Sequence, residues 1–473
     1  MTSLDKVEPA SIDRSARATP GNHVAIELRE TLRLALPMAL TQLGQIAMMT
    51  TDLALVGRLG DQAVAAAALA STVYFVSFTV GMGLVSAVSP LAAQAFGARN
   101  PRMVRRALRV GLWAALLISL PMLAFPLRGE QILLALGQAP ASVHLAQQYL
   151  FGLAWGIAPA LWFIAIRGFM GAVNRPEPVL WITLAAIPAN GVLVYLLIHG
   201  AWGLPRLELF GAGLATSLVN VGSVLAALWF VIRRRPFRKY HAFGRIWRID
   251  WSLMRKLVIV GAPISISLLL EYGLFGAAGL LMGVISTTAL AAHQIALQVT
   301  AILFMVPLGI SMAATVRVGH AVGRNDADGV RRAGFVAILL GIALVAALTL
   351  AVIASRDGIA HLFFGAAADG AGAAISLVET LLVIGATFFI ADGIQTIAAG
   401  ALRGMNDTRV PLLFAVVSYW LIGFASAWWL AFSTPLGARG VWIGLSIGTA
   451  VYAALLVWRF DLLSKRMAIH EGR

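Results

Sequence analysis

Long apolar stretches recur through almost the whole chain, and they constrain its fold more than any other feature. Of the 473 residues, 60% are hydrophobic and only 12% are charged. About 20 apolar residues form a helix long enough to cross the hydrocarbon core of a bilayer. Hydropathy and length predict twelve such helices. They cover residues 31–57, 64–90, 104–126, 145–167, 178–199, 210–233, 257–284, 290–315, 330–354, 375–402, 411–432 and 440–459. The sequence therefore predicts an all-α polytopic membrane protein and argues against a large soluble enzyme.

The basic residues are divided unequally between the two sides of this predicted bundle. Lys and Arg number 36, and the net charge is +15. Five lie on the side opposite the termini: Arg58, Arg128, Arg206, Arg356 and Arg439. Because cytoplasmic loops carry an excess of Lys and Arg, we expect both termini in the cytoplasm. The RRRPFRK run at 233–239 then marks topology and indicates no nucleic-acid partner.

The ends and the middle of the chain differ from the apolar stretches. Residues 1–30 are polar and mixed in charge, which predicts a disordered cytoplasmic tail. No basic segment leads directly into a short apolar core, so we expect no cleavable signal peptide. Residues 234–256 read as a cytoplasmic linker and 461–473 as a second tail. The absence of cysteine excludes disulfides and thiolate metal sites.

The two halves of the chain resemble each other. A shift of 226 residues aligns residues 37–107 with 263–333 without gaps and gives 19 identities in 71 positions. The similarity resumes at 165–168 and 401–404 with an offset of 236. Two six-helix lobes, 31–233 and 257–460, then form a parallel repeat. Transporters commonly hold substrate where such repeats meet, although a purely structural duplication stays an alternative.

Three acidic residues fall deep inside predicted helices: Asp52, Glu271 and Asp392. A charge at such a depth is costly, and these positions are functional candidates by default. No Lys or Arg lies at a comparable depth, so we expect no basic group to neutralise them. Their counterparts in the other half are not acidic: Ala278 for Asp52, Gln45 for Glu271 and Gly156 for Asp392. The scaffold is repeated, but the charges are not.

These carboxylates can serve ion exchange. A carboxylate surrounded by apolar groups resists being a bare anion, and a neighbouring carboxylate adds to that resistance. It therefore holds either a proton or another cation, which is what an exchanger requires. Glu271 and Asp392 belong to the same lobe and form the candidate pair, whereas Asp52 belongs to the other lobe. The structural alternative is that hydroxyls and backbone groups satisfy these acids and lock helices together.

Other polar residues in the helices are weaker candidates for a cavity lining. They are Gln42, Gln45, Asn190, His293, Gln294 and Gln298. Each could equally form an interhelical hydrogen bond, and an isolated His293 is more typical of a structural role. NDADG at 325–329 resembles the start of a calcium loop, but the remaining ligands do not follow, and a helix cap explains it.

Several motifs together resemble the multidrug and toxic compound extrusion (MATE) family in its NorM-type branch. They are LALPMAL at 34–40, TTDLALVGRLG at 50–60, LLLEYGLF at 268–275, ALAAHQIAL at 289–297, RVGHAVG at 317–323, ADGIQTIAAGALRG at 391–404, SYWLIG at 418–423 and PLGARGVWIG at 435–444. They span both halves and cover nearly everything after residue 30. Together they are specific, whereas any one alone is weak.

This resemblance implies twelve helices in two lobes around a central cavity, in a bacterial inner membrane. It implies export of small organic cations, such as dyes and fluoroquinolone-like drugs, in exchange for Na⁺ or H⁺. Asp52, Glu271 and Asp392 match the family's coupling acids, with Na⁺ expected at Glu271 and Asp392, and Asn190 matches a polar N-lobe position. We expect no other cofactor, no nucleic-acid partner, contact with membrane lipids and a monomer. In some relatives a tyrosine stands four residues before the acid at 392, where this chain has Phe388, which we count among the weaker candidates for the cavity lining.

Two other classes of protein agree less well with the sequence. A flippase for lipid-linked precursors would need basic groups in its cavity to hold a diphosphate, and the deep charges here are acidic. A membrane enzyme would need a catalytic cluster near the interface, and the sequence shows none. The sequence leaves open the choice between Na⁺ and H⁺ and the role of Asp52.

Overall fold

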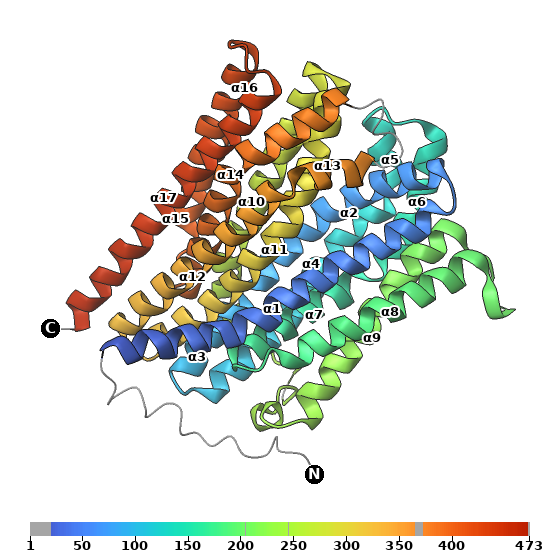
Figure 1. The fold of residues 1–473 in the computed structure, drawn as a ribbon. Helices are drawn as coiled ribbons and strands as arrows, with labels where there is room; N and C mark the ends of the chain where they lie inside the picture. The colour runs from blue at the N-terminus through green and yellow to red at the C-terminus, as the bar shows by residue number, and fades with distance from the viewer. Residues whose placement is uncertain (1–19, 204, 245, 365–371, 472–473) are drawn as a thin grey trace.

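The protein is a bundle of long helices that run roughly parallel to one axis (Figure 1). The computed structural model describes residues 20–203, 205–244, 246–364 and 372–471. The N-lobe contains α1 (Pro20–Gly57), α2 (Asp61–Ser86), α3 (Val88–Gly97), α4 (Pro101–Leu127), α5 (Gly129–Ala135), α6 (Pro140–Ala154), α7 (Ile157–Ala172), α8 (Glu177–His199), the short η3 (Ala201–Gly203) and α9 (Glu208–Arg233). The short η4 (Phe237–Tyr240) lies in the connection between the lobes.

The C-lobe repeats this arrangement with longer unbroken helices. It contains α10 (Trp251–Ile285), α11 (Thr287–Gly323), α12 (Ala327–Ala354), α13 (Arg356–Phe364), α14 (Gly372–Gly404), α15 (Arg409–Ala415), η6 (Val416–Phe424), α16 (Ala425–Phe432) and α17 (Ala438–Glu471). The segment η6 is a π-helix that joins α15 to α16. Helix α1 begins and α17 ends at the same end of the bundle, which we call the terminal face (Figure 1).

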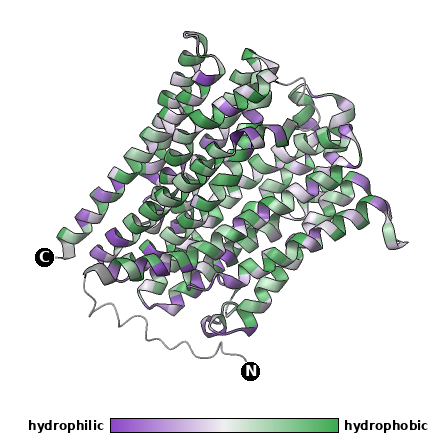
Figure 2. Ribbon diagram, viewed as in Figure 1, coloured by the Kyte–Doolittle hydropathy of each residue, from purple (hydrophilic) through white to green (hydrophobic). Residues whose placement is uncertain are grey.

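The helices have the length and composition of membrane spans. Within the described ranges, ten are long and apolar enough to cross a bilayer, and α6 with α7, bent by 46° at their break, would make an eleventh. The first predicted span, residues 31–57, lies within the 38-residue helix α1, which is not among those ten. Hydrophobic residues cover the helices, and hydrophilic ones gather toward the terminal face (Figure 2). The prediction of an all-α polytopic membrane protein is confirmed.

The predicted tails and linker are shorter than expected. Residues 20–30 belong to α1, so this part of the first tail is helical and not disordered, and residues 461–471 of the second tail continue α17. Helix α10 begins at Trp251, which shortens the linker from 234–256 to 234–250. The polar composition misled here because a helix that emerges from a membrane can continue on a polar surface. Residues 1–19 and 472–473 lie outside the described residues.

The repeat extends into the turns at the terminal face. Arg99 and Asn325, 226 residues apart, both have left-handed backbone conformations, with φ of 53° and 55°. The following residues, Asn100 and Asp326, cap the next helices by accepting hydrogen bonds from the N–H groups of Met103 at 3.0 Å and Gly329 at 2.7 Å. Such caps satisfy N–H groups that the helix leaves unpaired. The reading of NDADG as a helix cap is therefore correct.

The first helix of each half packs into both lobes. Leu34, Ala35 and Met38 of α1 belong to the hydrophobic core of the C-lobe. Leu253, Leu257 and Val260 of α10 belong to a core built mainly by α2, α3, α4 and α7. Farther along, α1 also packs on α8, and α10 packs on η6. Any movement of one lobe against the other must therefore involve α1 and α10.

Glycines bring the lobes into backbone contact along an interlobe seam. A Cβ at Gly97 would lie 2.2 Å from the carbonyl oxygen of His320, and one at Gly323 would lie 2.0 Å from that of Gln94. Both pairs are related by the 226-residue shift, so the contact is symmetric. Closer to the middle of the bundle, Cβ atoms at Gly83 and Gly309 would each lie 2.5 Å from a Cα atom, of Ser265 and Ala39 respectively. Small residues permit this close approach of helices.

Polar side chains close the seam at the terminal face. The Gln94 amide donates to the carbonyl of Gly404 at 2.8 Å and accepts from the Asn406 amide at 2.7 Å. The Nε2 atom of His320, the counterpart of Gln94, lies 2.7 Å from the carbonyl oxygen of Ala172. Each lobe thus bonds to the end of a helix in the other, and together they hold the terminal face closed.

Candidate functional site

Glu271 of α10 and Asp392 of α14 share one hydrogen-bond donor. The amide nitrogen Nε2 of Gln395 donates to Glu271 Oε1 at 3.1 Å and to Asp392 Oδ1 at 2.8 Å. Asp392 and Gln395 lie three residues apart on one face of α14, and both are buried. The structure thus brings together the two acids that the sequence proposed as a pair.

The other end of the Gln395 amide faces the π-helical segment. The Tyr419 hydroxyl donates to Gln395 Oε1 at 2.6 Å. The next residue, Trp420, donates from its indole nitrogen to the carbonyl of Leu270 at 3.3 Å, directly before Glu271. Segment η6 therefore contacts Gln395, which bridges the two acids, and the residue directly before Glu271. Single π-helical turns occur frequently at functional sites, and they shift side chains relative to an α-helix.

A basic residue lies on the same helix as Asp392, nearer the terminal face. Arg403, near the end of α14, is close enough for its charge to act on that of Glu271. Among the described residues, however, no ion pair joins Arg403 to Glu271 or Asp392. The expectation that no basic residue within the helices neutralises these acids therefore stays a prediction.

Asp52 lies in a separate polar site in the N-lobe. Asn190 of α8 donates a hydrogen bond from its amide to Asp52 Oδ1. Thr216 of α9 donates to Asp52 Oδ2 at 3.2 Å. The amide oxygen of Asn190 is buried and has no hydrogen-bond partner among the described residues. Asp52 and Asn190, which the sequence presented as separate candidates, thus belong to one site, and neither joins the pair in the C-lobe.

The remaining predicted cavity residues lie in different surroundings. Gln45 is half-buried and Gln298 is exposed. His293 is fully buried in the C-lobe, where the Trp442 indole donates to its Nδ1 at 3.2 Å. Phe388 is also buried, with its ring 5.7 Å from that of Trp442. The structure therefore places His293 and Phe388 in the packing of the lobe and not on an open surface.

Three polar residues of these sites were missed in the sequence: Gln395, Tyr419 and Thr216. Gln395 could have been found from its position three residues after Asp392, on the same helical face. Tyr419 could not, because it reaches the pair from another span. Among the described residues, no group of three or more His, Cys, Asp and Glu could hold a metal ion. Na⁺ at Glu271 and Asp392, which offer two carboxylates, stays a prediction.

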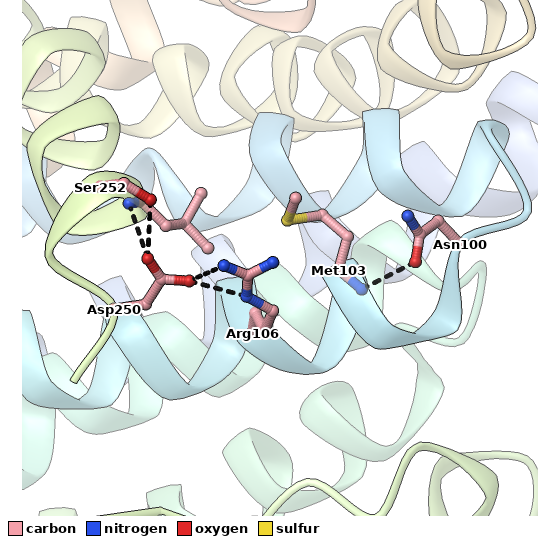
Figure 3. Close-up of polar contacts among 6 residues, drawn as sticks. Asn100, Met103, Arg106, Asp250 and Ser252 are labelled. Carbon is pink, nitrogen blue, oxygen red and sulfur yellow. Dashed lines mark hydrogen bonds and ion pairs between the residues drawn. The ribbon is translucent and has the colours of Figure 1, made fainter. Parts of the chain in front are cut away.

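An ion pair at the terminal face fastens the linker between the lobes to the N-lobe (Figure 3). The Arg106 guanidinium of α4 donates to Asp250 Oδ2, with its Nε at 2.7 Å, and Asp250 caps α10 through the N–H of Leu253 at 3.2 Å. Partial burial raises the pKa of Asp250, but hydrogen bonds from Ser252, Arg106 and Leu253 and the Arg106 charge outweigh it, so the pKa is lowered from its ordinary value. The carboxylate is therefore held in its charged form.

Comparison with known protein families agrees with this architecture. The family model described as MatE matches residues 37–196 and 263–429. The chain belongs to the MATE family. The two matched segments begin 226 residues apart, so the family model matches the chain once in each half. This agrees with the internal repeat found in the sequence.

Relatives of this MATE protein match it over almost their whole length. A protein described as a probable multidrug resistance protein NorM from Bradyrhizobium diazoefficiens is 67% identical over 467 residues, covering 99% of this chain and all of the relative. A protein of the same description from Rhodopseudomonas palustris is 63% identical, covering 93% of this chain and 92% of the relative. The chain is thus a MATE transporter of the NorM type and not an enzyme.

Solved MATE structures share its fold. A eukaryotic MATE transporter, AtDTX14, superposes with a TM-score of 0.84 at 20% identity, covering 94% of this chain and 98% of that one. A multidrug resistance MATE transporter solved in an outward-facing conformation gives 0.84 at 21% identity, covering 95% and 99%. These matches establish the twelve-helix MATE fold.

Proposed function

We propose that this MATE transporter exports small organic cations in exchange for a coupling cation, Na⁺ or H⁺. The observation that carries the proposal is the buried pair Glu271 and Asp392, bridged by the Gln395 amide inside the C-lobe. One neutral amide donor does not neutralise the negative charge of two carboxylates. A metal cation or a proton can neutralise it, and either of them can displace the other from the pair.

Coupling requires that the ion bind the two access states unequally. A ligand shifts a conformational equilibrium only by its difference in affinity for the two states. The site lies on α10, which packs into both lobes, so an ion there acts on an element that any lobe movement must displace. The membrane potential adds about 2.3 kcal/mol per 100 mV for each charge that crosses the full field.

The closed terminal face supports an orientation for this cycle. The basic residues concentrate on that face, so we infer that it is cytoplasmic and that both termini lie there, in a bacterial inner membrane. The seam then closes the transporter toward the cytoplasm. Organic cations, including dyes and fluoroquinolone-like drugs, fit acidic sites because they carry the complementary charge.

A lipid-linked precursor flippase is the second candidate, and the site argues against it. Such a substrate carries a diphosphate and calls for several basic groups in the cavity. Among the described residues, Arg403 is the basic group whose charge acts on Glu271, and one arginine falls short of that requirement. Competition for binding by polyprenyl diphosphates, and not by organic cations, would favour the flippase.

The test is ethidium efflux from preloaded, transporter-deficient bacteria that express either wild type or Glu271→Gln. Separate Na⁺ and acid pulses are applied at equal membrane levels of each protein. We expect one pulse to drive efflux by wild type and to have no effect on Glu271→Gln. The pulse that works identifies the coupling ion.

A matched control is Glu379→Gln, which removes an acid from α14 outside the pair. It is expected to respond to the pulse as wild type does. Wild-type efflux by Glu271→Gln would overturn the coupling role of the pair.

A further inference from the structure

The orientation of the Gln395 amide depends on what the two carboxylates hold. An amide NH₂ group can only donate hydrogen bonds, and an ionised carboxylate can only accept them. In the structure the NH₂ group faces both Glu271 and Asp392, and the amide oxygen faces the Tyr419 hydroxyl. This arrangement suits carboxylates that carry neither a proton nor a metal ion.

An occupied pair needs the opposite orientation. A bound Na⁺ prefers oxygen ligands, and a protonated carboxyl needs an acceptor for its O–H. Both are poorly served by an NH₂ group that points at the pair. A half-turn about the last side-chain torsion of Gln395 presents Oε1 to the occupant, and that torsion has a broad, roughly two-fold preference.

We propose that Gln395 is a positioning residue that reverses its amide when an ion occupies Glu271 and Asp392, and that Tyr419 opposes the reversal. This rests on the proposed coupling role of the pair. Before the reversal, the Tyr419 hydroxyl donates to Oε1 at 2.6 Å. After it, the hydroxyl meets the NH₂ group, so its oxygen can accept from the amide but its O–H loses the acceptor to which it donated. Tyr419 therefore stabilises the empty site and weakens ion binding.

The surroundings connect this reversal to the bundle. Tyr419 lies in the π-helical segment η6, whose next residue, Trp420, donates to the carbonyl before Glu271. The other titratable groups that interact with the pair and Tyr419 are Arg403 and Tyr452, the latter with its ring 4.9 Å from that of Tyr419. A change at Gln395 therefore alters contacts of η6 and α14. Through the bond from Trp420 to Leu270, it also reaches α10.

The test measures ion affinity without any transported substrate. Purified full-length protein is unfolded by heat and followed by tryptophan fluorescence, first across NaCl concentrations at fixed ionic strength, then across pH without Na⁺. A ligand that binds only the folded state stabilises it by RT ln(1 + L/Kd), where L is the ligand concentration, so the rise of the unfolding temperature with ligand concentration yields the affinity. Tyr419→Phe removes only the hydroxyl. We expect it to bind the ion about five- to tenfold more tightly, which corresponds to one ordinary hydrogen bond.

Two further variants decide whether Gln395 transmits this effect. Tyr452→Phe removes a buried hydroxyl from the ring that packs edge-to-face on Tyr419, and it is expected to leave ion affinity near the wild-type value. When Gln395→Leu is also present, Tyr419→Phe should have no further effect on affinity. A purely structural Tyr419 would weaken or leave unchanged the ion binding when its hydroxyl is removed.

The possible results separate this inference from the proposed function. If Glu271→Gln abolishes ion-dependent stabilisation but Tyr419→Phe does not tighten binding, the amide reversal is wrong and the coupling role stands. Tightening that persists with Gln395→Leu also overturns the reversal. If Glu271→Gln leaves ion-dependent stabilisation intact, or if wild type shows none, both proposals are wrong.

Discussion

The two lobes share a backbone plan but bury different polar groups. The C-lobe joins Glu271, Asp392, Gln395 and Tyr419 in one network across three spans. The counterparts of the first three in the N-lobe are Gln45, Gly156 and Pro159. Gly156 lies where α6 and α7 separate at a 46° bend, whereas α14 runs unbroken through Asp392. The N-lobe instead holds Asp52 with Asn190 and Thr216.

The two halves of the chain agree at the interlobe seam and differ in the polar sites inside the lobes. Gly97 and Gly323, with Gln94 and His320, keep equivalent contacts because each lobe has to fit the other. The polar interiors face no such mutual constraint and have diverged. Even the paired arginines differ: Arg403 interacts with Glu271, while its counterpart Arg167 donates to neutral Gln42 at 2.8 Å. The contacts between the lobes therefore follow the repeat, whereas the polar sites inside the lobes do not.

The largest expected effect comes from substitution of the buried acids, which differ between the two lobes. Asp392→Asn should reduce ion-driven ethidium efflux at least about 100-fold, since the pair loses a charge that the ion must replace. Asp52→Asn should reduce it only several-fold, because the amide can still bond to Asn190 and Thr216. Efflux rates at matched expression measure both. An equal or larger loss for Asp52→Asn would move the coupling site to the N-lobe.

The next effect tests the symmetric seam. Gly97→Ala places a methyl group against the His320 carbonyl, where no space exists. Overpacking of this kind typically costs about 1–3 kcal/mol, so the closed terminal face should lose population roughly tenfold or more. Because the chain has no cysteine, Asn406→Cys can report opening through its rate of maleimide labelling.

Two controls accompany that experiment. Gly222→Ala, in α9, adds a methyl group where no atom lies within 4 Å and should leave the labelling rate unchanged. Gly323→Ala, at the symmetric position, should accelerate labelling as Gly97→Ala does. Different behaviour of the two symmetric variants would show that the lobes do not separate as equivalent bodies.

A third prediction concerns an interlobe contact that has no symmetric copy. Arg317 of α11 bonds both oxygens of Glu27 of α1, each at 2.8 Å, and both side chains are largely buried. The counterparts of these residues are Leu91 and Leu253. Glu27→Gln should cost about 2 kcal/mol of stability, since it leaves a buried guanidinium without its charge partner. Thermal unfolding in detergent measures this, and an unchanged unfolding temperature would contradict it.

The smallest effect is a pH dependence at the linker. The lowered pKa of Asp250 means that its bond to Arg106 adds stability above the ordinary aspartate value near 4 and loses it as the pH falls through the lower, folded value. Asp250→Asn should lower stability by about 1 kcal/mol at pH 7. Thermal unfolding at a series of pH values should show wild type and variant converge in strong acid, and a constant gap would contradict the assignment.

Most of the fold could be predicted from the sequence, because apolar length and the 226-residue repeat are properties of the chain alone. The same holds for the cap at Asp326 and for the proximity of Glu271 and Asp392, which share one hydrogen-bond donor. Long-range pairings were harder. Nothing in helical periodicity indicates that Tyr419, from a span with a π-helical turn, reaches Gln395. The action of the Arg403 charge on Glu271 is equally hidden in the sequence, because a long side chain extends its reach beyond its position along the helix.

The glycine seam also bears on how readily the lobes can separate. Its contacts join backbone to backbone, so closing it freezes few side-chain rotamers, and the entropy lost per contact is small. The glycines themselves carry no side chain, so separation at these positions uncovers little apolar surface in return. When the free energies gained and lost on closing the seam are both small, the closed and open conformations stay close in free energy. The binding of one ion can then shift the equilibrium between them.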